Sequence, residues 1–365
     1  MPEVKLVNIT KRYGKIVAND DISFTIKDGE YVSIIGPSGC GKTTMIKNIA
    51  GIIQPDSGEI YIDGNPVTDL PIEDRGIGYV FQNIALFPHM TVWDNITYGP
   101  RVKGFTPEEI RALALEMLEM IKVDARSDAF PDELSGGTQQ KTAVARALMS
   151  RAELLLLDEP LGALDVKVRA ELRFELRRLV KDLKLTALHV THDQEEAMSI
   201  SDRVLVMKRG RIVEAGVPIT LYSQPKNIFT ANFVGEANFL TGVITQVSDE
   251  GSLIDVGDGL QLMTKSIDKR IGNRVVIAFR PEFASIGDGK KVNRISGKVK
   301  DALYSGSIMR LKVQLANGDL IIVKKALNFE KPKSIIGKKT SVTISPDNII
   351  VYDQPENLNK ELALE

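Results

Sequence analysis

Apolar and polar residues follow two different rhythms along the first 235 residues of the chain. Short apolar or alternating stretches predict β-strands at residues 4–7, 22–26, 31–35, 154–157 and 186–190. Apolar residues at helical spacing predict helices at residues 106–121, 139–149 and 166–183. The first helix has a clear start, with Thr106 as the cap and Pro107 after it. Strands that alternate with helices predict an α/β core built on a parallel sheet.

The pattern changes after residue 235. Short strands are predicted at residues 242–244, 275–279, 310–315 and 320–323, with Gly-Asp, Asn-Gly and Ser-Gly turns between them. No long helical pattern is found in this part of the sequence. We therefore expect a separate all-β domain, a small barrel or sandwich, reached through a connection at residues 222–236.

The composition is typical of a soluble globular protein with two or three domains. The 365 residues are 43% hydrophobic and 26% charged, which excludes disorder over most of the chain. A single cysteine excludes an internal disulfide and a cysteine-rich zinc site. No uncharged apolar run approaches the about 18 residues of a membrane helix, and the first residues lack a signal-peptide stretch. We therefore expect a cytoplasmic protein.

The net charge changes sign near residue 240. Residues 1–239 carry 28 Lys and Arg against 33 Asp and Glu, whereas residues 240–352 carry 18 against 11. This step supports a domain boundary. The positive charge of the second region would suit nucleic acid, but its aromatic residues are not interleaved with basic ones. Lysine-rich strand edges explain the charge more simply, so no nucleic-acid partner is expected.

A glycine-rich loop follows the predicted strand at residues 31–35. Its sequence, G-P-S-G-C-G-K-T from Gly36 to Thr43, fits the phosphate-loop pattern G-x-x-x-x-G-K-[ST]. The glycines let backbone N–H groups surround a polyphosphate, and the helix that follows adds its positive end. Lys42 is expected to reach the β- and γ-phosphates, and Thr43 to hold Mg²⁺. Cys40 is either a small packing residue or a thiol activated by the helix N-terminus.

Two carboxylates follow the predicted strand at residues 154–157. Asp158 is placed to hold Mg²⁺ through water, and Glu159 to polarise the attacking water. Further upstream, Ser135 and two glycines precede a predicted helix and form a second anion site. Two anion sites far apart in one sequence suggest that ATP is shared between two chains.

The order of three motifs carries a family resemblance. The phosphate loop, L-S-G-G-x-Q-Q from Leu134 and L-L-L-L-D-E-P from Leu154 resemble the ATP-binding-cassette (ABC) ATPases over about the first 235 residues. The resemblance implies a P-loop NTPase fold: a RecA-like core, an antiparallel β-subdomain and a helical subdomain at about residues 86–150. It also implies hydrolysis of ATP with Mg²⁺. Thr138 and Lys141 depart from the usual pattern, since the family most often has Gln and Arg there.

The resemblance also implies roles for particular residues. Tyr13 would stack on adenine, and Gln82 would sense Mg²⁺ and the attacking water. Asp165 would lie in a loop that crosses a dimer interface, and His192 would contact the γ-phosphate. The implied catalytic residues are Lys42, Gln82, Glu159 and His192, and the implied metal contacts are Thr43, Gln82 and Asp158. The implied nucleotide contacts are Tyr13, Gly36, Pro37, Ser38, Gly39, Cys40, Gly41, Lys42, Thr43, Thr44, Gln82, Ser135, Gly136, Gly137, Asp158, Asp165 and His192.

The partners follow from the same resemblance. A second copy would pack head to tail, so that residues 36–43 of one chain face Ser135 to Gly137 of the other. Residues 83–105, rich in aromatic side chains, are either a local hydrophobic cluster or a groove for transmembrane permease subunits. The chain would then be cytoplasmic and peripheral on the inner face of the cell membrane, and would serve a solute-binding protein indirectly. The solute stays open among sugars, polyamines, metals and oxyanions.

The last third resembles the OB-like (TOBE) regulatory domain of importer ATPases of the maltose, polyamine and iron types. Arg280-Pro281-Glu282 and the strand pattern at residues 302–323 carry this likeness. The expected domains are therefore an ABC ATPase at 1–235, an OB-like β-barrel at 236–352 and an acidic tail at 353–365. Stabilising the dimer and receiving regulatory signals are the expected roles of the barrel.

Three functions compete at this point. The first is the ATPase subunit of an ABC importer. The alternative is a soluble ABC ATPase that acts on nucleic acid or ribosomes, but such proteins usually carry two cassettes or a long coiled coil, and neither is found here. A third is a binding module without turnover, against which the presence of Lys42, Asp158, Glu159 and His192 argues.

Overall fold

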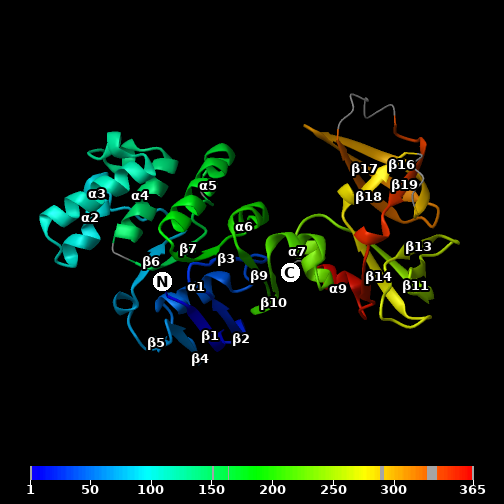
Figure 1. Cartoon of the computed structure of the whole chain (residues 1–365), viewed down its shortest axis with the longest axis horizontal. Coiled ribbons are helices and arrows are strands. Elements are labelled where there is room, and N and C mark those ends of the chain that lie inside the picture. Colours follow the sequence, from blue (N-terminus) through cyan, green and yellow to red (C-terminus); the bar gives the residue numbers. More distant parts are fainter. Residues whose placement is uncertain (1, 150–151, 163, 288–291, 327–334, 364–365) are drawn as a thin grey trace. The chain divides into compact units, whose positions relative to one another are not determined.

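The computed structural model describes residues 2–149, 152–162, 164–287, 292–326 and 335–363. The chain divides into two compact units, Met1–Ile219 and Thr220–Glu365. Figure 1 shows the α/β architecture of the first unit and the strands of the second. None of the helices in the described residues is both long and apolar enough to span a membrane.

A six-stranded sheet forms the centre of the first unit. Its strand order is β10-β9-β3-β8-β7-β6, and all neighbouring strands are parallel except β9 and β10. The strands are β3 (Tyr31–Ile35), β6 (Ile77–Val80), β7 (Leu154–Asp158), β8 (Thr186–Val190), β9 (Arg203–Lys208) and β10 (Arg211–Gly216). The parallel sheet predicted from the sequence is thus confirmed.

The leucines of β7 show how this sheet is buried on both faces. Leu155 and Leu157 belong to one apolar cluster, whereas Leu154 and Leu156 belong to another. Successive side chains of a strand point to opposite faces, so an uninterrupted apolar run requires cover on both sides. Helices α4 (Gly136–Met149) and α5 (Val166–Asp182) contribute to the first cluster, and α1 (Lys42–Ala50) to the second.

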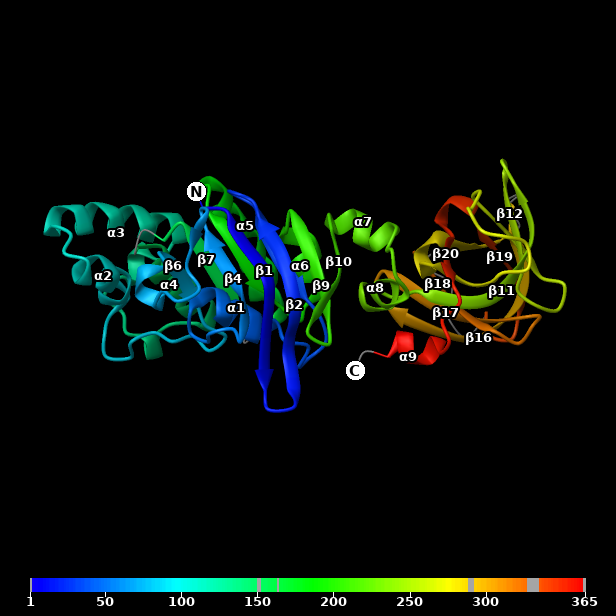
Figure 2. The same ribbon diagram turned by 90° about the horizontal axis from the view of Figure 1, so that it is seen from below.

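A smaller antiparallel sheet with the order β2-β1-β4-β5 completes the second cluster. Its strands are β1 (Val4–Tyr13), β2 (Ile16–Ile26), β4 (Ser57–Ile62) and β5 (Asn65–Pro66). Figure 2 shows the long β1 and β2 strands and, close to them, helix α1. This sheet matches the antiparallel β-subdomain that the family resemblance implied.

A group of helices lies beyond β6 in Figure 1 and contains α2 (Val92–Val102), α3 (Pro107–Ile121) and α4. The predicted start of α3 is confirmed: Thr106 Oγ1 accepts a hydrogen bond from Glu109 N, and Glu109 Oε2 accepts one from Thr106 N at 2.9 Å. This unit also contains α6 (Gln194–Ile200) and 3₁₀ turns at Ile72–Asp74, Asp124–Arg126 and Pro131–Glu133. Helix α7 (Pro218–Ser223) begins at the end of the first unit and continues into the second.

The second unit consists mainly of strands, and its larger apolar cluster draws on both of its sheets. Its two antiparallel sheets have the orders β13-β12-β11-β14-β20 and β15-β19-β16-β17-β18, and both supply buried side chains to one cluster. The strands are β11 (Asn238–Ser248), β12 (Gly251–Asp255), β13 (Gln261–Thr264), β14 (Arg274–Phe279), β15 (Ala284–Ile286), β16 (Arg294–Ser305), β17 (Ile308–Leu315), β18 (Leu320–Ala326), β19 (Lys339–Ile344) and β20 (Ile350–Asp353). The predicted barrel-like class is confirmed.

The two units divide earlier in the chain than the expected boundary at residue 235. Helix α8 (Ile228–Phe233) packs with the second unit, because Ile228 and Ala231 share an apolar cluster with Val276 and Ala278 of β14. Arg280 fixes the same segment by donating to the carbonyls of Tyr222, Ala231, Gly235 and Glu236. The expected acidic tail contains a short helix, α9 (Leu358–Leu362), whose leucines pack against this cluster.

Candidate active site

The loop between β3 and α1 is shaped by its glycines. Gly41 has φ +106°, and a Cβ there would lie 2.0 Å from the carbonyl oxygen of Ala18. A Cβ on Gly36 would lie 2.3 Å from the carbonyl oxygen of Met207 and 2.6 Å from Cys40 Sγ. Neither position therefore tolerates a side chain, because backbone cannot retreat from it. This packing sets the loop directly before the first turn of α1, where the helix N–H groups are unpaired within the helix.

Lys42 is the first residue of α1, and its ammonium group turns back toward the loop. Lys42 Nζ donates to the carbonyls of Gly36 at 2.8 Å and Pro37 at 3.0 Å. The side chain of Cys40 is buried nearby, and burial raises the pKa of its thiol despite the charge of Lys42. This favours the packing role over an activated thiol, because the thiolate is the reactive form.

Asp158, at the end of β7, approaches the start of α1. Its Oδ1 accepts from Thr43 Oγ1 at 3.4 Å, and its Oδ2 accepts from the Tyr79 hydroxyl at 3.0 Å. Burial raises the pKa of Asp158, and the hydrogen bond from Tyr79 opposes that shift. A hydroxyl and a carboxylate oxygen are hard donors of the kind that Mg²⁺ takes, and Mg²⁺ completes its shell with water and phosphate. These two residues therefore fit the metal.

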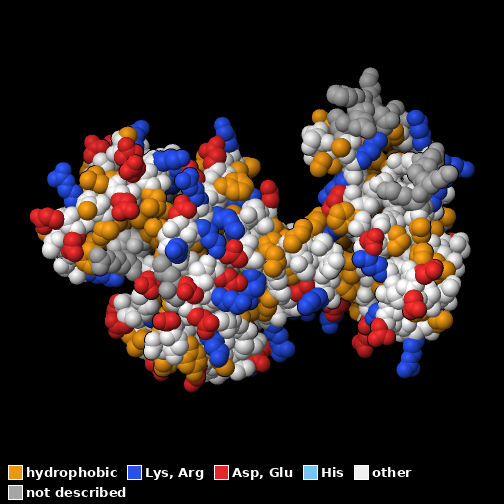
Figure 3. All heavy atoms as spheres, viewed as in Figure 1, with side chains coloured by type: hydrophobic (Ala, Val, Ile, Leu, Met, Phe, Trp, Pro, Cys, Tyr) orange, Lys and Arg blue, Asp and Glu red, His pale blue; other side chains and the backbone are white. Residues whose placement is uncertain are grey.

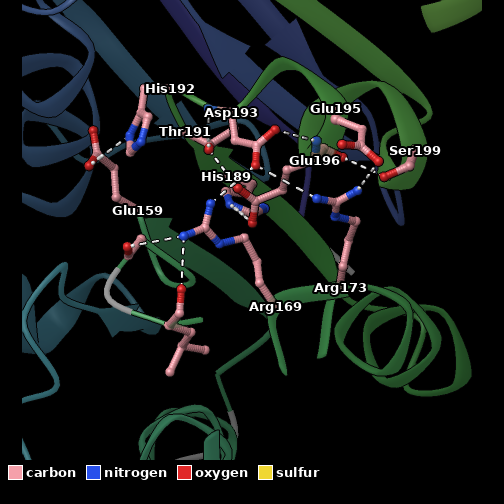
Figure 4. Close-up of polar contacts among 12 residues, drawn as sticks. Glu159, Arg169, Arg173, His189, Thr191, His192, Asp193, Glu195, Glu196 and Ser199 are labelled. Atoms are coloured by element: carbon pink, nitrogen blue, oxygen red, sulfur yellow. Dashed lines mark hydrogen bonds and ion pairs between the residues drawn. The ribbon is translucent and has the colours of Figure 1, made fainter. Parts of the chain in front are cut away.

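Glu159 brings two other residues together, as Figure 4 shows in part. Its Oε2 accepts from Gln82 Nε2 at 2.9 Å and lies 3.2 Å from His192 Nδ1. The backbone of Glu159 has φ +47°, a region that a side chain rarely adopts, and its N–H donates to the Val190 carbonyl at 2.8 Å. The strained turn after β7 thus aims the carboxylate at residues from two other segments.

Ser135 and the two glycines that follow lie at the N-terminus of α4. Ser135 Oγ accepts from Thr138 N at 3.3 Å and lies 2.9 Å from Thr138 Oγ1. The glycines pack against α5 and the loop before it: a Cβ on Gly136 would lie 3.1 Å from Leu164, and one on Gly137 would lie 2.8 Å from Val168. The unusual Lys141 pairs with Glu175 of α5 at 2.7 Å.

The other residues that the resemblance implied as nucleotide contacts lie on several different elements. Asp165 caps α5, with Oδ1 accepting from Lys167 N and Val168 N at 3.1 Å each. Tyr13 ends β1 with an exposed ring, 5.8 Å from the ammonium of Lys11. Thr44 follows Thr43 in the first turn of α1 and is half-buried. Ala163, which the sequence grouped with Asp165, lies outside the described residues.

The aromatic region after Gln82 is partly a local cluster. Phe87 packs against Tyr98 with ring centroids 4.8 Å apart, and the guanidinium of Arg146 in α4 lies 5.0 Å from the Phe87 ring. Trp93 packs against the core, whereas Tyr98 stays 41% exposed. The fully buried Asn95 holds residues 87–91 by bonding to Phe87 and other backbone groups of this segment. The interpretation of this region as a local hydrophobic cluster thus has a counterpart in the structure.

Sequence reasoning missed three residues near this site. Tyr79 lies on β6, a strand that the pattern did not predict, so its contact with Asp158 was hidden. Arg169 and Asp193 belong to a second network behind His192, which Figure 4 draws. Arg169 had no distinguishing signal, because α5 is rich in charged residues and such residues usually face solvent.

The sequence matches two family models: residues 19–162 match the ABC transporter model, and residues 277–351 match the TOBE domain model. Two curated relatives share the name spermidine/putrescine import ATP-binding protein PotA. The protein from Mannheimia succiniciproducens is 36% identical over 364 residues, 98% of each chain. The protein from Nitrosospira multiformis is 40% identical over 327 residues, 88% of this chain and 90% of that one.

Solved structures give the same result for the first unit. One is a dimeric post-hydrolysis state of the ATP-binding cassette MJ0796 bound to ADP and Pi, with TM-score 0.53, 36% identity, and coverage of 59% of this chain and 98% of that one. Another is cbiO1 from Clostridium perfringens, with TM-score 0.57 and 30% identity over 60% of this chain and 90% of that one. The chain therefore belongs to the ABC transporter family, as an ATP-hydrolysing importer subunit with a TOBE domain.

Proposed function

We propose that residues 36–44 bind the phosphates of ATP and that Glu159 activates the attacking water. The contact of one Glu159 oxygen with both Gln82 and His192 supports this proposal most directly. An ionised carboxylate only accepts, so the proton of this contact lies on His192 Nδ1. The other ring nitrogen, Nε2, would face a γ-phosphate oxygen and would need a proton of its own to donate to it, because both ring nitrogens donate only in the imidazolium form. Gln82 would orient the same carboxylate toward water.

Lys42 and Asp158 would provide the charges of the phosphate site, the first by binding phosphate oxygens and the second by holding Mg²⁺. The ammonium of Lys42 donates to neutral loop carbonyls, which charged phosphate oxygens would displace because charge-assisted hydrogen bonds are stronger. Thr43 and Asp158 would hold Mg²⁺, whose charge offsets that of the phosphates when it is bound. Tyr79 would keep Asp158 ionised, because its hydroxyl donates to the carboxylate.

Two copies would complete each ATP site. MJ0796, which resembles the first unit, is dimeric in its structure with ADP and Pi. Ser135 and the first turn of α4 offer a second set of backbone N–H groups, and a two-fold dimer would bring that turn to the phosphate loop of the partner. The expected contacts of Tyr13 with adenine and of Asp165 with the second chain belong to the same proposal.

The dimer would drive permease subunits at the inner face of the membrane through the segment at residues 83–105, in which the exposed Tyr98 lies beside Phe87. A solute-binding protein would act on those permease subunits rather than on this chain. The names of the relatives favour polyamines as the solute class. Charged polyamines cannot cross a bilayer unaided, so they need a permease of the kind that this subunit would drive.

The test is the Glu159→Gln variant of the full chain. Loss of the general base should lower kcat for ATP at least about a hundredfold, which is the usual contribution of such a group. ATP and Mg²⁺ should still bind and should hold the variant as a dimer on a sizing column. Glu153→Gln, an exposed acid before β7, is the matched control and should behave as wild type. A monomeric Glu159→Gln chain with saturating ATP would contradict the dimer proposal.

A further inference from the structure

The guanidinium of Arg169 joins two loops that lie on either side of the proposed catalytic centre. Arg169 projects from the first turn of α5 and donates to the carbonyls of Leu164 at 2.9 Å and Gly162 at 3.4 Å. Its other terminal nitrogen lies 3.4 Å from Asp193 Oδ2. Figure 4 shows Arg169 between the backbone turn below it and the Asp193 carboxylate above. One side chain therefore binds a loop before α5 and a loop before α6.

The first loop touches the N-terminus of α4. Leu164 packs on Gly136 so closely that a Cβ on that glycine would lie 3.1 Å from the leucine. Leu164 also belongs to an apolar cluster with Leu161 and Leu172. A shift of Gly136 relative to α5 would therefore move Leu164, because such packing leaves little free space.

The second loop carries His192. Asp193 Oδ1 caps α6 by accepting from Glu196 N at 3.1 Å, and Asp193 N donates to Thr191 Oγ1 at 3.0 Å. Thr191 in turn donates to the buried carboxylate of Glu196 at 2.6 Å. His192 thus sits between two anchored neighbours, and Asp193 is the one whose anchor reaches α5.

We propose that Arg169 is a positioning residue that links the Leu164 turn to His192. When ATP draws Gly136 toward the phosphates bound by a partner, Leu164 and Arg169 pass the displacement to Asp193. His192, held at the Nδ1 contact with Glu159 that this structure already shows, then moves with Asp193. This inference rests on the proposed dimer for its trigger, but the link between Arg169 and His192 lies within one chain.

The geometry favours arginine for a specific reason. A guanidinium presents five N–H donors in a fixed fork, so it can bind two carbonyls and a carboxylate at once. Arg173, one turn later on the same face, lies 3.7 Å from Asp193 Oδ2 and 3.3 Å from Glu195 Oε1. Its contacts with described residues therefore anchor the α6 side. Arg169 is the arginine of this pair that binds both loops.

The test measures steady-state ATP hydrolysis by the full chain. Arg169→Met keeps the length of the side chain and removes the fork, so kcat should fall about tenfold while KM for ATP changes less than about twofold. Arg169→Lys should recover part of kcat, because the ammonium can still reach Asp193 but cannot bind both carbonyls. Arg178→Met is the control, since Arg178 lies on the same helix, is 79% exposed and pairs only with Asp182 among its described ion pairs.

Repeating the Arg169→Met substitution in a His192→Ala variant tells whether Arg169 acts by positioning His192 or only by stabilising the fold. In His192→Ala chains, Arg169→Met should cause no further loss of kcat, since the residue that it positions is gone. An equal loss in both backgrounds, a rise in KM alone, or unchanged kcat would overturn the inference. Arg169→Lys decides the matter if Arg169→Met fails to fold. If Glu159→Gln stays monomeric while these effects are seen, the dimer proposal fails and the link to His192 stands.

Discussion

Cys40 shows how tightly the phosphate loop is packed at the scale of single residues. Its side chain is 5% exposed and lies against Gly36, where no Cβ fits. Burial raises the pKa of the thiol, whereas the helix N-terminus and Lys42 act in the opposite direction. The burial effect is the larger one, so the thiol stays protonated at neutral pH. A small apolar residue is therefore what the loop requires.

Alkylation should test this directly, because Cys40 is the single cysteine of the chain. We expect a maleimide to label the native chain at least about tenfold more slowly than the chain unfolded in guanidinium, since both access and thiolate are reduced. Mass spectrometry gives the labelled fraction against time. Cys40→Ala should keep ATP hydrolysis near the wild-type rate. Native labelling as fast as that of the unfolded chain would show an activated thiol instead.

Asp202 illustrates how elements of the first unit are joined. It directly precedes β9 and accepts from Tyr31 N of β3 at 2.8 Å and from Lys181 Nζ of α5 at 2.5 Å. Arg177 adds a contact at 3.2 Å. Burial opposes the ionisation of Asp202, but these donors outweigh it and hold the pKa below the ordinary value of 3.8. The ionised carboxylate therefore stabilises the junction between sheet and helix.

Asp202→Asn should lower the free energy of unfolding of the first unit by about 1–2 kcal/mol at neutral pH, because charge-assisted hydrogen bonds are lost at a partly exposed site. A depressed pKa in the folded state means that this contribution is complete well above 3.8 and disappears as pH falls through the folded value. Thermal unfolding from pH 7 down to acid should show the gap between variant and wild type closing.

Asp182→Asn is the control for that measurement, since Asp182 forms an exposed pair with Arg178 one turn apart on α5. It should change stability by less than about 0.5 kcal/mol at any pH. A gap between Asp202→Asn and wild type that stays constant across the whole pH range would show that the loss is one of packing and not of charge.

At the scale of the whole molecule, the proposed catalytic residues can be compared with the charged surface of the first unit. The residues that surround Glu159 come from the central sheet and its loops, whereas the face in Figure 3 carries Lys, Arg, Asp and Glu interspersed over the first unit. Such a mixed surface gives no single field to attract one solute. This chain hydrolyses ATP, and we expect the choice of solute to lie with other chains.

Uptake by whole cells tests that division of roles. Deleting the gene should abolish uptake of labelled spermidine and putrescine, and the wild-type gene should restore it. The Glu159→Gln gene should fail to do so, because binding without turnover cannot drive repeated cycles. Uptake of a sugar and of sulfate serves as the control and should stay normal. Normal polyamine uptake with loss of another solute would overturn the polyamine proposal and keep the importer ATPase.

The sequence alone determined whatever depends on neighbours in the chain. The glycine-rich loop at residues 36–41, the cap at Thr106 and the buried run at β7 are local patterns, because turn geometry, capping and strand burial act over a few residues. The family order of the motifs added the candidate residues around ATP. Both domains of the fold were predictable on these grounds.

The tertiary structure alone determined the contacts between residues that are far apart in the sequence. Tyr79 reaches Asp158 because β6 pairs with β7, and Arg169 binds Leu164 and Asp193 because α5 lies beside α6. The buried Arg280 assigned the connecting segment to the second unit by holding its carbonyls. These contacts join residues far apart in the chain, and their energies depend on burial and geometry that no local pattern contains.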